Sequence, residues 1–243
     1  MTVSDDDSMR IQTLPGLREQ VAERLRMAIA TGRFPPGARL IERELCEMLG
    51  VSRPSLREAL RELQVDGLVT LQPNKGLSVS IVTPEIARLI YEVRAALEGL
   101  AARLFARNAT EEQLKALRRS VNHLADVYED FSADAFITAK TRFYDILLEG
   151  AGNPIAADML KRIHTRASQL RVVSLSREER AKQSIKELRA FLDALEARDE
   201  DLSYRLCVAH IEAAAIAALE AIDRKLGNSA GEGDRLRRGQ STS

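Results

Sequence analysis

Tryptophan is absent from the 243-residue chain, and its aromatic residues are six phenylalanines and four tyrosines. The core must therefore be built from leucine, alanine, valine and isoleucine. Cysteine is also scarce: Cys46 and Cys207 are far apart in the sequence, and neither stands in a CxxC or Cys/His spacing. This usage excludes a disulfide framework and a zinc finger, and it is typical of a reducing cytoplasm.

The chain has no excess charge of either sign, because 36 Lys and Arg residues balance 36 Asp and Glu residues. No overall basic field draws it to nucleic acid, so any nucleic-acid-binding surface must be a local patch. No apolar run approaches the length of a membrane span. Residues 1–12 are polar and acidic, which is unlike a signal peptide and predicts a disordered N-terminus. We expect a cytoplasmic protein.

The central stretch is residues 42–63, ERELCEMLGVSRPSLREALREL. Gly50 separates two segments of helical periodicity, Ser52 is a good cap for the second helix, and Pro54 falls in its first turn. A preceding helix over 14–31 completes a scaffold. This layout is typical of a helix-turn-helix whose second helix reads DNA in the major groove.

A β-hairpin is predicted directly after these helices. Residues 68–71 and 77–82 carry strand patterns, and Pro73-Asn74-Lys75-Gly76 forms the turn between them. Residues 38–40 form a short strand that would pair with this hairpin. A helix-turn-helix followed by a hairpin is a winged helix, here spanning 13–82. At its tip Lys75 can contact a phosphate, and Gly76 lets the backbone come close.

Five side chains of the helix-turn-helix are candidates for DNA contact. Arg53 and Arg57 lie four residues apart and share one helix face, from which an arginine fork can bind guanine. Ser52 and Ser55 can bind phosphate at the positive end of the helix. Arg43 in the preceding helix is placed to contact a backbone phosphate.

The remainder of the chain has helical periodicity and no strand pattern. We expect six helices at 84–107, 110–130, 133–150, 154–174, 177–197 and 200–226, so that residues 83–226 form an all-α antiparallel bundle and the fold is mostly α. Thr110 with Gln113, and Ser176 with Glu179, have the spacing of capping boxes. Residues 227–243 are Gly/Ser-rich and charged, which predicts a disordered tail.

The run VSRPSLREALRELQVDGLVTLQPNKGLSV resembles the winged-helix signature of GntR-family bacterial transcription regulators. YEVRAALEGLAARLFARNAT, FYDILLEGAGNP and LRAFLDALEARDED resemble the FCD effector-binding domain of the FadR subfamily, and six helices are typical of its VanR-like branch. The resemblance covers about 12–225. It implies a homodimer that binds a palindromic operator, usually as a repressor, and it assigns DNA contacts to the same residues: Arg43, Ser52, Arg53, Ser55, Arg57, Lys75 and Gly76.

Many members of this family hold a divalent metal through an aspartate and three histidines. In this sequence the corresponding positions are Lys140, Tyr144, Leu188 and His210, so we expect no metal and no cofactor. Lys140 instead brings a positive charge, and Arg94 would face the same cavity. We predict a small organic acid held by Lys140 and Arg94, with hydrogen bonds from Tyr144 and His210. In the alternative, Lys140 pairs with an internal acid and side chains fill the pocket.

These features predict a ligand-responsive DNA-binding repressor that is released by an organic acid. One alternative is a constitutive DNA-binding regulator with a vestigial pocket. A helical enzyme is a second alternative, but no nucleophile–base pair, phosphate-binding glycine loop or paired-carboxylate motif stands out, so we expect none. The first helix of the bundle, over 86–104, has a wide apolar face and is a candidate dimer interface. The sequence identifies neither the effector nor the operator.

Overall fold

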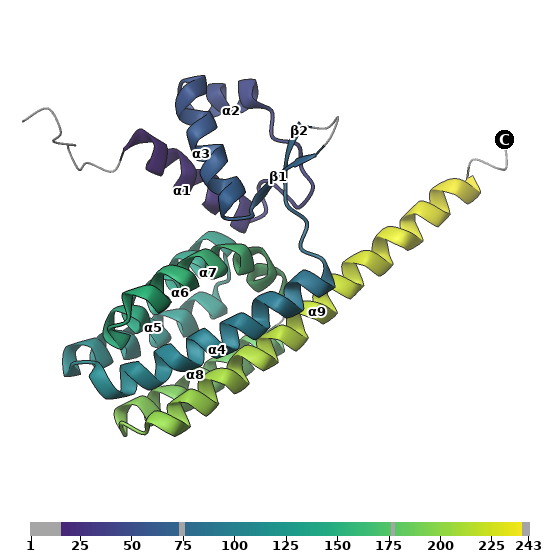
Figure 1. Cartoon of the computed structure of the whole chain (residues 1–243). Helices are drawn as coiled ribbons and strands as arrows, with labels where there is room; N and C mark the ends of the chain where they lie inside the picture. The colour runs from purple at the N-terminus through teal and green to yellow at the C-terminus, as the bar shows by residue number, and fades with distance from the viewer. Residues whose placement is uncertain (1–15, 73–75, 176–177, 240–243) are drawn as a thin grey trace, which may run out of the picture.

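The computed structural model describes residues 16–72, 76–175 and 178–239. Within these residues there are nine helices and one two-stranded sheet. Figure 1 shows two bodies, a small N-terminal one and a larger helical bundle, with the last helix running past the bundle. A winged helix followed by a helical bundle is the architecture that the sequence predicted.

The N-terminal body is a winged helix made of α1 (Leu17–Ala30), α2 (Glu42–Leu49), α3 (Arg53–Val65), β1 (Val69–Gln72) and β2 (Gly76–Val79). The strands pair antiparallel, with Val69 opposite Val79. The predicted third strand is confirmed as an isolated bridge between Arg39 and Ser78. Backbone hydrogen bonds between residues 37–40 and strand β2 join the segment before α2 to the wing. The helices and the hairpin therefore form one unit.

The core of this body comes from the apolar faces of its three helices and the hairpin: Val21, Leu25, Ile29, Leu45, Leu56, Ala59, Leu60, Leu63 and Val79. Gly50 ends α2 in the left-handed conformation, with φ of 65°, as a tight turn between two helices requires. Burying one face of α3 leaves its opposite face exposed along the whole helix.

The larger body consists of α4 (Pro84–Asn108), α5 (Glu111–Glu129), α6 (Ala133–Ala151), α7 (Pro154–Leu175), α8 (Glu178–Glu196) and α9 (Glu200–Gly239). The six predicted helices are confirmed. The Thr83 and Ser132 side chains cap α4 and α6, and Thr110 with Gln113 forms the predicted capping box. These caps bond N–H groups that have no partner within the helix, and so they fix where each helix begins.

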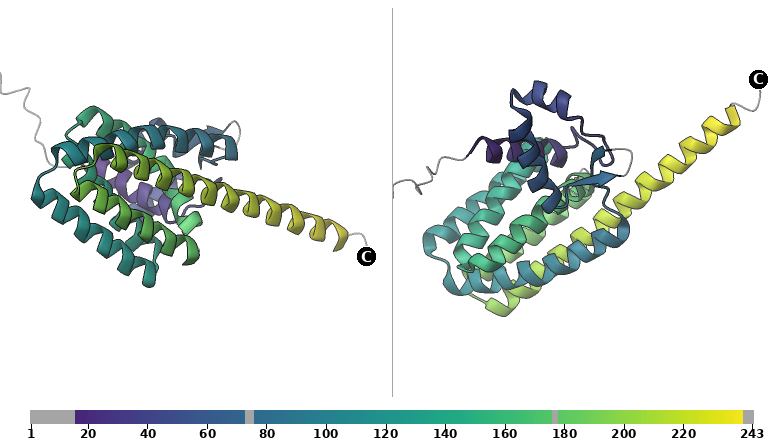
Figure 2. Two further views of the ribbon diagram at one scale, coloured as in Figure 1. Left: turned by 90° about the horizontal axis from the view of Figure 1, so that it is seen from below. Right: turned by 45° about the horizontal axis from the view of Figure 1, so that its top comes forward.

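The end of α9 differs from the prediction. Disorder was expected from residue 227, but α9 continues to Gly239 and projects away from the bundle (Figure 2). Extending an existing helix adds one backbone hydrogen bond per residue without a new nucleation step, and this can outweigh a composition poor in helix formers. Residues 1–12 and 240–243, and Ser176 of the second predicted capping box, lie outside the described residues.

The two bodies meet where α1 packs against α6 and α7. A short connection over 80–83 leads from the wing into α4 (Figures 1 and 2). Within the bundle the most extensive packing is between α4 and α9. Through 16–72, 76–175 and 178–239, no helix has both the length and the apolar content to cross a membrane.

Candidate nucleic-acid interface and ligand pocket

The start of α3 is built as an exposed, positively polarised helix end. The Ser52 hydroxyl accepts a hydrogen bond from the Ser55 N–H at 3.4 Å, and the two hydroxyl oxygens lie 3.0 Å apart. Pro54 occupies the first turn, where its missing N–H leaves no bond unmade. Both serines are therefore held at a helix N-terminus, a position that favours contact with an anion such as phosphate.

Three arginines, Arg53, Arg57 and Arg61, follow one another at four-residue intervals on the exposed face of α3. Arg57 donates from Nε to both carboxylate oxygens of Glu42 at 3.0 Å. Arg61 is paired with Glu58 at 2.6 Å. The helix thus presents Arg53 and Arg57 on one exposed face near its N-terminus, and Arg61 lies one turn further along.

The other predicted DNA contacts lie on either side of α3. Arg43 is exposed near the start of α2, 3.7 Å from Glu47 of the same helix. Gly76 begins β2 with φ of 78°. Lys75 lies outside the described residues.

A groove of about 450 Å³ separates α3 from the wing. Arg39, Arg57 and Gly76 are among its lining residues. Arg39 was not among the DNA contacts predicted from the sequence. The predicted pairing of residues 38–40 with the hairpin could have indicated that Arg39 lies beside the wing.

A second polar cluster lies inside the bundle around Glu98. Arg94 donates from Nε to Glu98 at 2.7 Å and from Nη2 to the Tyr144 hydroxyl at 3.1 Å. His164 Nε2 lies 3.0 Å from the same Glu98 oxygen. Burial opposes the charge of Arg94, yet the Glu98 carboxylate and the Tyr144 and Tyr91 hydroxyls raise its pKa, so the guanidinium stays charged. Its Nη1 atom is buried without a hydrogen-bond partner among the described residues.

A third polar cluster surrounds Glu187. His210 Nδ1 lies 2.6 Å from Glu187, and Arg180 donates to both oxygens of that carboxylate at 3.0 Å. Burial, aided by the positive charges of Lys140 and Arg180, lowers the pKa of His210 to about 4 against the opposing effect of Glu187. Lys140 is itself buried, with Nζ 5.8 Å from the centre of the Tyr144 ring. Lys140 therefore lies between the two clusters.

The residues at the family's metal-binding positions do not fit a divalent metal. Lys140 is cationic, Leu188 is part of the apolar core, and Tyr144 already accepts a hydrogen bond from Arg94. Within the described ranges there is no group of three or more His, Cys, Asp or Glu side chains that could hold a metal ion. A single imidazole, His210, is insufficient for the four-ligand geometry of such sites.

The predicted pocket residues are thus neighbours, but they divide between two carboxylates that the sequence analysis did not select. Glu98 binds Arg94, and Glu187 binds His210. The spacing of Arg94 and Glu98, four residues apart, was a usable signal for a helical ion pair. Glu187 and His210 are 23 residues apart on different helices, so only the fold brings them together. His123 is exposed on α5 and takes no part in either cluster.

A cleft of about 850 Å³ lies between the two bodies. Tyr144 and His164 line it from the bundle, whereas Arg94, Lys140 and His210 are not among its lining residues. Asp145 also lines the cleft, and partial burial raises its pKa against the opposing charges of Lys161 and Arg142.

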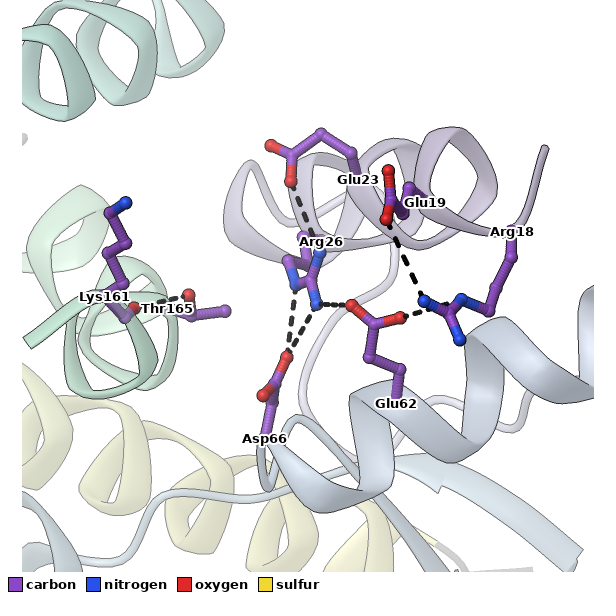
Figure 3. A network of polar contacts seen from close by, with 8 residues as sticks. All are labelled: Arg18, Glu19, Glu23, Arg26, Glu62, Asp66, Lys161 and Thr165. Atoms are coloured by element: carbon purple, nitrogen blue, oxygen red, sulfur yellow. Dashed lines mark hydrogen bonds and ion pairs between the residues drawn. The ribbon is translucent and has the colours of Figure 1, made fainter. Parts of the chain in front are cut away.

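The wall of the cleft on the winged-helix side is held by an ion-pair network. Arg26 of α1 bonds Glu62 at 2.5 Å and Asp66 at 2.8 Å, which ties α1 to the end of α3. Figure 3 shows this network, with Lys161 and Thr165 of α7 on the opposite side. The cleft is therefore bounded both by the helix that carries Arg53 and Arg57 and by residues adjoining the buried Arg94 cluster.

Comparison with known proteins agrees with this architecture. Residues 17–79 match the family described as bacterial regulatory proteins, gntR family, and residues 89–213 match the FCD domain. The HTH-type transcriptional regulator YdhC of Bacillus subtilis (strain 168) is 27% identical over 192 residues, which cover 79% of this chain and 86% of that protein. A probable D-xylose utilization operon transcriptional repressor of Paenarthrobacter nicotinovorans is 29% identical over 211 residues, covering 86% and 91%.

The solved structure of E. coli McbR/YncC superposes with a TM-score of 0.74 at 26% identity, covering 85% of this chain and 98% of that one. A winged helix-turn-helix with an exposed arginine pair, joined to this helical bundle, defines a DNA-binding transcriptional regulator. The chain belongs to the gntR family and carries an FCD domain. Its relatives are transcriptional regulators and not enzymes, and some are named as repressors.

Proposed function

We propose that the protein is a ligand-responsive repressor that binds a palindromic operator as a homodimer and is released by a small organic acid. Its site of action is the cytoplasm, where its DNA target lies. The observation that carries the DNA-binding part is the exposure of Arg53 and Arg57 together on the N-terminal half of α3. A recognition helix contacts base edges with this part, and an arginine fork there is suited to guanine.

The DNA contacts are tested by substitution. We expect Arg53→Ala and Arg57→Ala each to weaken operator binding by about 1–3 kcal/mol and to relax base preference, because base contacts specify sequence. Arg43→Ala and Lys75→Ala should weaken binding to all duplexes similarly and reduce the salt dependence, because they contact phosphate. Arg119→Ala, at an exposed position on α5, is the control. If neither Arg53→Ala nor Arg57→Ala changes the base preference, these arginines do not read bases.

The proposed acid site is centred on Arg94. A buried guanidinium with one terminal nitrogen unbonded can accept a further anionic partner, and Lys140 adds a second positive charge nearby. Tyr144 connects this cluster to the interdomain cleft, since it both bonds Arg94 and lines the cleft. An acid entering from the cleft would reach Tyr144 first, and His210 would lie at the far side of Lys140.

One observation favours the alternative of constitutive DNA binding. Glu98 already supplies a carboxylate to Arg94 at 2.7 Å, so the chain contains an internal anion where the effector would bind. A regulator with this arrangement could hold DNA without any acid. The two functions differ in one measurable property, the response of the protein–DNA complex to added metabolites.

Two experiments test the effector. Gel-shift titration on the protein's own promoter region, with and without members of an acid library, should show release by at least one acid. DNA binding that no metabolite alters would support the constitutive alternative. Calorimetry on wild type and Lys140→Ala then tests the site, and equal affinities would contradict the role of Lys140. Arg94 is unsuitable for this test, because removing it would take away the guanidinium that balances the charge of the buried Glu98, at a cost of about 3–5 kcal/mol.

A further inference from the structure

We propose that Glu42 is a positioning residue that sets the base specificity of Arg57. The carboxylate holds Arg57 by Nε alone, at 3.0 Å from each of its oxygens. The two terminal nitrogens of Arg57 have no partner among the described residues. Since Nε is occupied, the guanidinium is restricted to contacts made with its terminal fork, the arrangement that matches O6 and N7 of guanine.

Glu42 is well placed for this task because it is anchored independently of Arg57. It is the first residue of α2, where the positive end of the helix dipole stabilises a carboxylate. The two residues are 15 positions apart, so their contact crosses the turn between α2 and α3. The packing of the two helices therefore determines the position of the Arg57 side chain before DNA arrives, and less side-chain freedom remains to be lost on binding.

The other arginines on this face differ in this respect. Arg61 is paired with Glu58 on its own helix, and no ion pair of Arg53 is formed within the described residues. Arg57 is thus the member of the series that is fixed from a neighbouring helix. Arg57 remains 59% exposed and Glu42 31% exposed, so the guanidinium is held without being buried. Both side chains line the groove between α3 and the wing.

Because Glu42 is negatively charged, its removal should change the affinity for the operator and the affinity for an unrelated duplex in opposite directions. A carboxylate beside DNA repels phosphates, so its removal should strengthen binding to an unrelated duplex. If Glu42 positions Arg57, its removal should weaken binding to the operator, because Arg57 would lose its fixed orientation. The ratio of operator affinity to non-specific affinity must therefore fall. A carboxylate that merely lowered local charge, or merely supported the fold, would not change the two affinities in opposite directions.

The test uses duplexes selected by the wild-type protein from random DNA, with an unrelated duplex of equal length as the non-specific probe. We expect Glu42→Ala to lower the affinity ratio about 5- to 20-fold, within the range of one bidentate base contact. Glu42→Gln, which retains one oxygen acceptor for Nε, should restore part of the ratio. Glu47→Ala, at an exposed residue of the same helix paired with Arg43, is the matched charge control and should leave the ratio unchanged.

A double-mutant cycle with Arg57→Ala completes the design. If Glu42 acts through Arg57, Glu42→Ala should not reduce the ratio further in the Arg57→Ala background. The inference rests on the proposed reading role of Arg57. If Arg57→Ala lowers the ratio but Glu42→Ala and Glu42→Gln do not, only the role of Glu42 is overturned. If Arg57→Ala leaves the ratio unchanged, both the reading role and the inference are overturned.

Discussion

Two carboxylates, the buried Glu98 and the partly exposed Glu187, organise the polar clusters of the bundle. Each bonds one arginine and one histidine: Glu98 bonds Arg94 and His164, and Glu187 bonds Arg180 and His210. Such pairs add little stability over an apolar core of equal volume, but removing one partner leaves a costly unpaired charge. Ionised groups retained at this cost are typical of a functional site, and the Glu98 cluster adjoins the cleft through Tyr144 and His164.

The stability of the protein should fall on mild acidification because of His210. Its folded pKa is about 4 against an ordinary 6.5, so between these values the unfolded chain binds a proton that the folded chain excludes. Stability is therefore complete above about pH 6.5 and is lost as pH falls toward 4. From pH 7.5 to 5 the expected loss is about 2 kcal/mol. Urea denaturation at a series of pH values measures it.

His210→Gln should flatten this dependence, and His123→Gln, at an exposed site, is the control. The facing charged groups are Glu187, Arg180 and Lys140. Burial would raise the pKa of Glu187, but His210 and Arg180 lower it below its ordinary value. The contribution of Glu187 is therefore lost only below the chosen pH window. An unchanged slope in His210→Gln would contradict the assignment to His210.

Residue types with a local signature were predictable from the sequence, and tertiary partners were not. Ser52, Pro54 and Arg57 follow rules of helix ends and helix faces, which operate within a few positions. The bond between Arg57 and Glu42, or between His164 and Glu98, needs two helices to be placed first. The family resemblance grouped Arg94, Lys140, Tyr144 and His210 into one predicted pocket, but their hydrogen-bond partners Glu98 and Glu187 required the fold.

Among the structural elements, α7 adjoins both functional regions. His164 points into the Glu98 cluster, and Arg166 lies against the turn at Gly67 that follows α3. A Cβ atom added at Gly67 would lie 2.9 Å from Arg166 Nε. The absence of a side chain at Gly67 therefore allows the two bodies to approach this closely.

Gly67→Ala should consequently cost more than an equivalent change elsewhere. Gly67 has φ of 74° and Gly32 has φ of 83°. An alanine at either site would be held in the left-handed conformation, which costs about 1–2 kcal/mol. Nothing lies within 4 Å of a Cβ at Gly32. We expect Gly67→Ala to lower the free energy of unfolding more than Gly32→Ala does, and the excess to vanish in an Arg166→Ala background. If the extra loss of stability in Gly67→Ala is the same with and without Arg166→Ala, contact with Arg166 is not its cause.

Apart from the end of α9, the helices were predicted to within a few residues because their ends are encoded locally. Thr83, Thr110 and Ser132 each accept a bond from the backbone N–H three residues on, and Gly152 ends α6 in the left-handed conformation. The length of α9 was underestimated because composition alone does not reveal that a helix is already propagating when it reaches a glycine-rich stretch. The packing of α1 on α6 and α7 has no local signature.

At the scale of the whole molecule, an apolar strip on α4 and α9 supports the proposed homodimer. Large apolar side chains are exposed along neighbouring helices: Leu89, Val93, Leu100 and Ile216. A second copy of the chain fits this strip, because reading a two-fold operator needs two recognition helices about one DNA turn apart. The strip lies on the helix that the sequence suggested as the interface.

Val93→Glu should therefore convert the dimer into a monomer. Light scattering after size-exclusion chromatography should give twice the chain mass of 27.0 kDa for wild type and the single-chain mass for the variant. Operator affinity should fall in parallel. Ile155→Glu is the control, since Ile155 is 69% exposed on α7, away from the strip. If Val93→Glu keeps the dimer mass, this face is not the dimer interface. If Ile155→Glu loses the dimer, the interface lies at the start of α7 instead.

The cleft between the two bodies also connects the protein to its solvent. A hollow of about 850 Å³ has room for roughly thirty water molecules at the volume each occupies in the liquid. A ligand that fills the cleft returns that water to bulk, so its binding is favoured when water activity is lowered. We therefore expect osmolytes that are too large to enter the cleft to strengthen the binding of such a ligand.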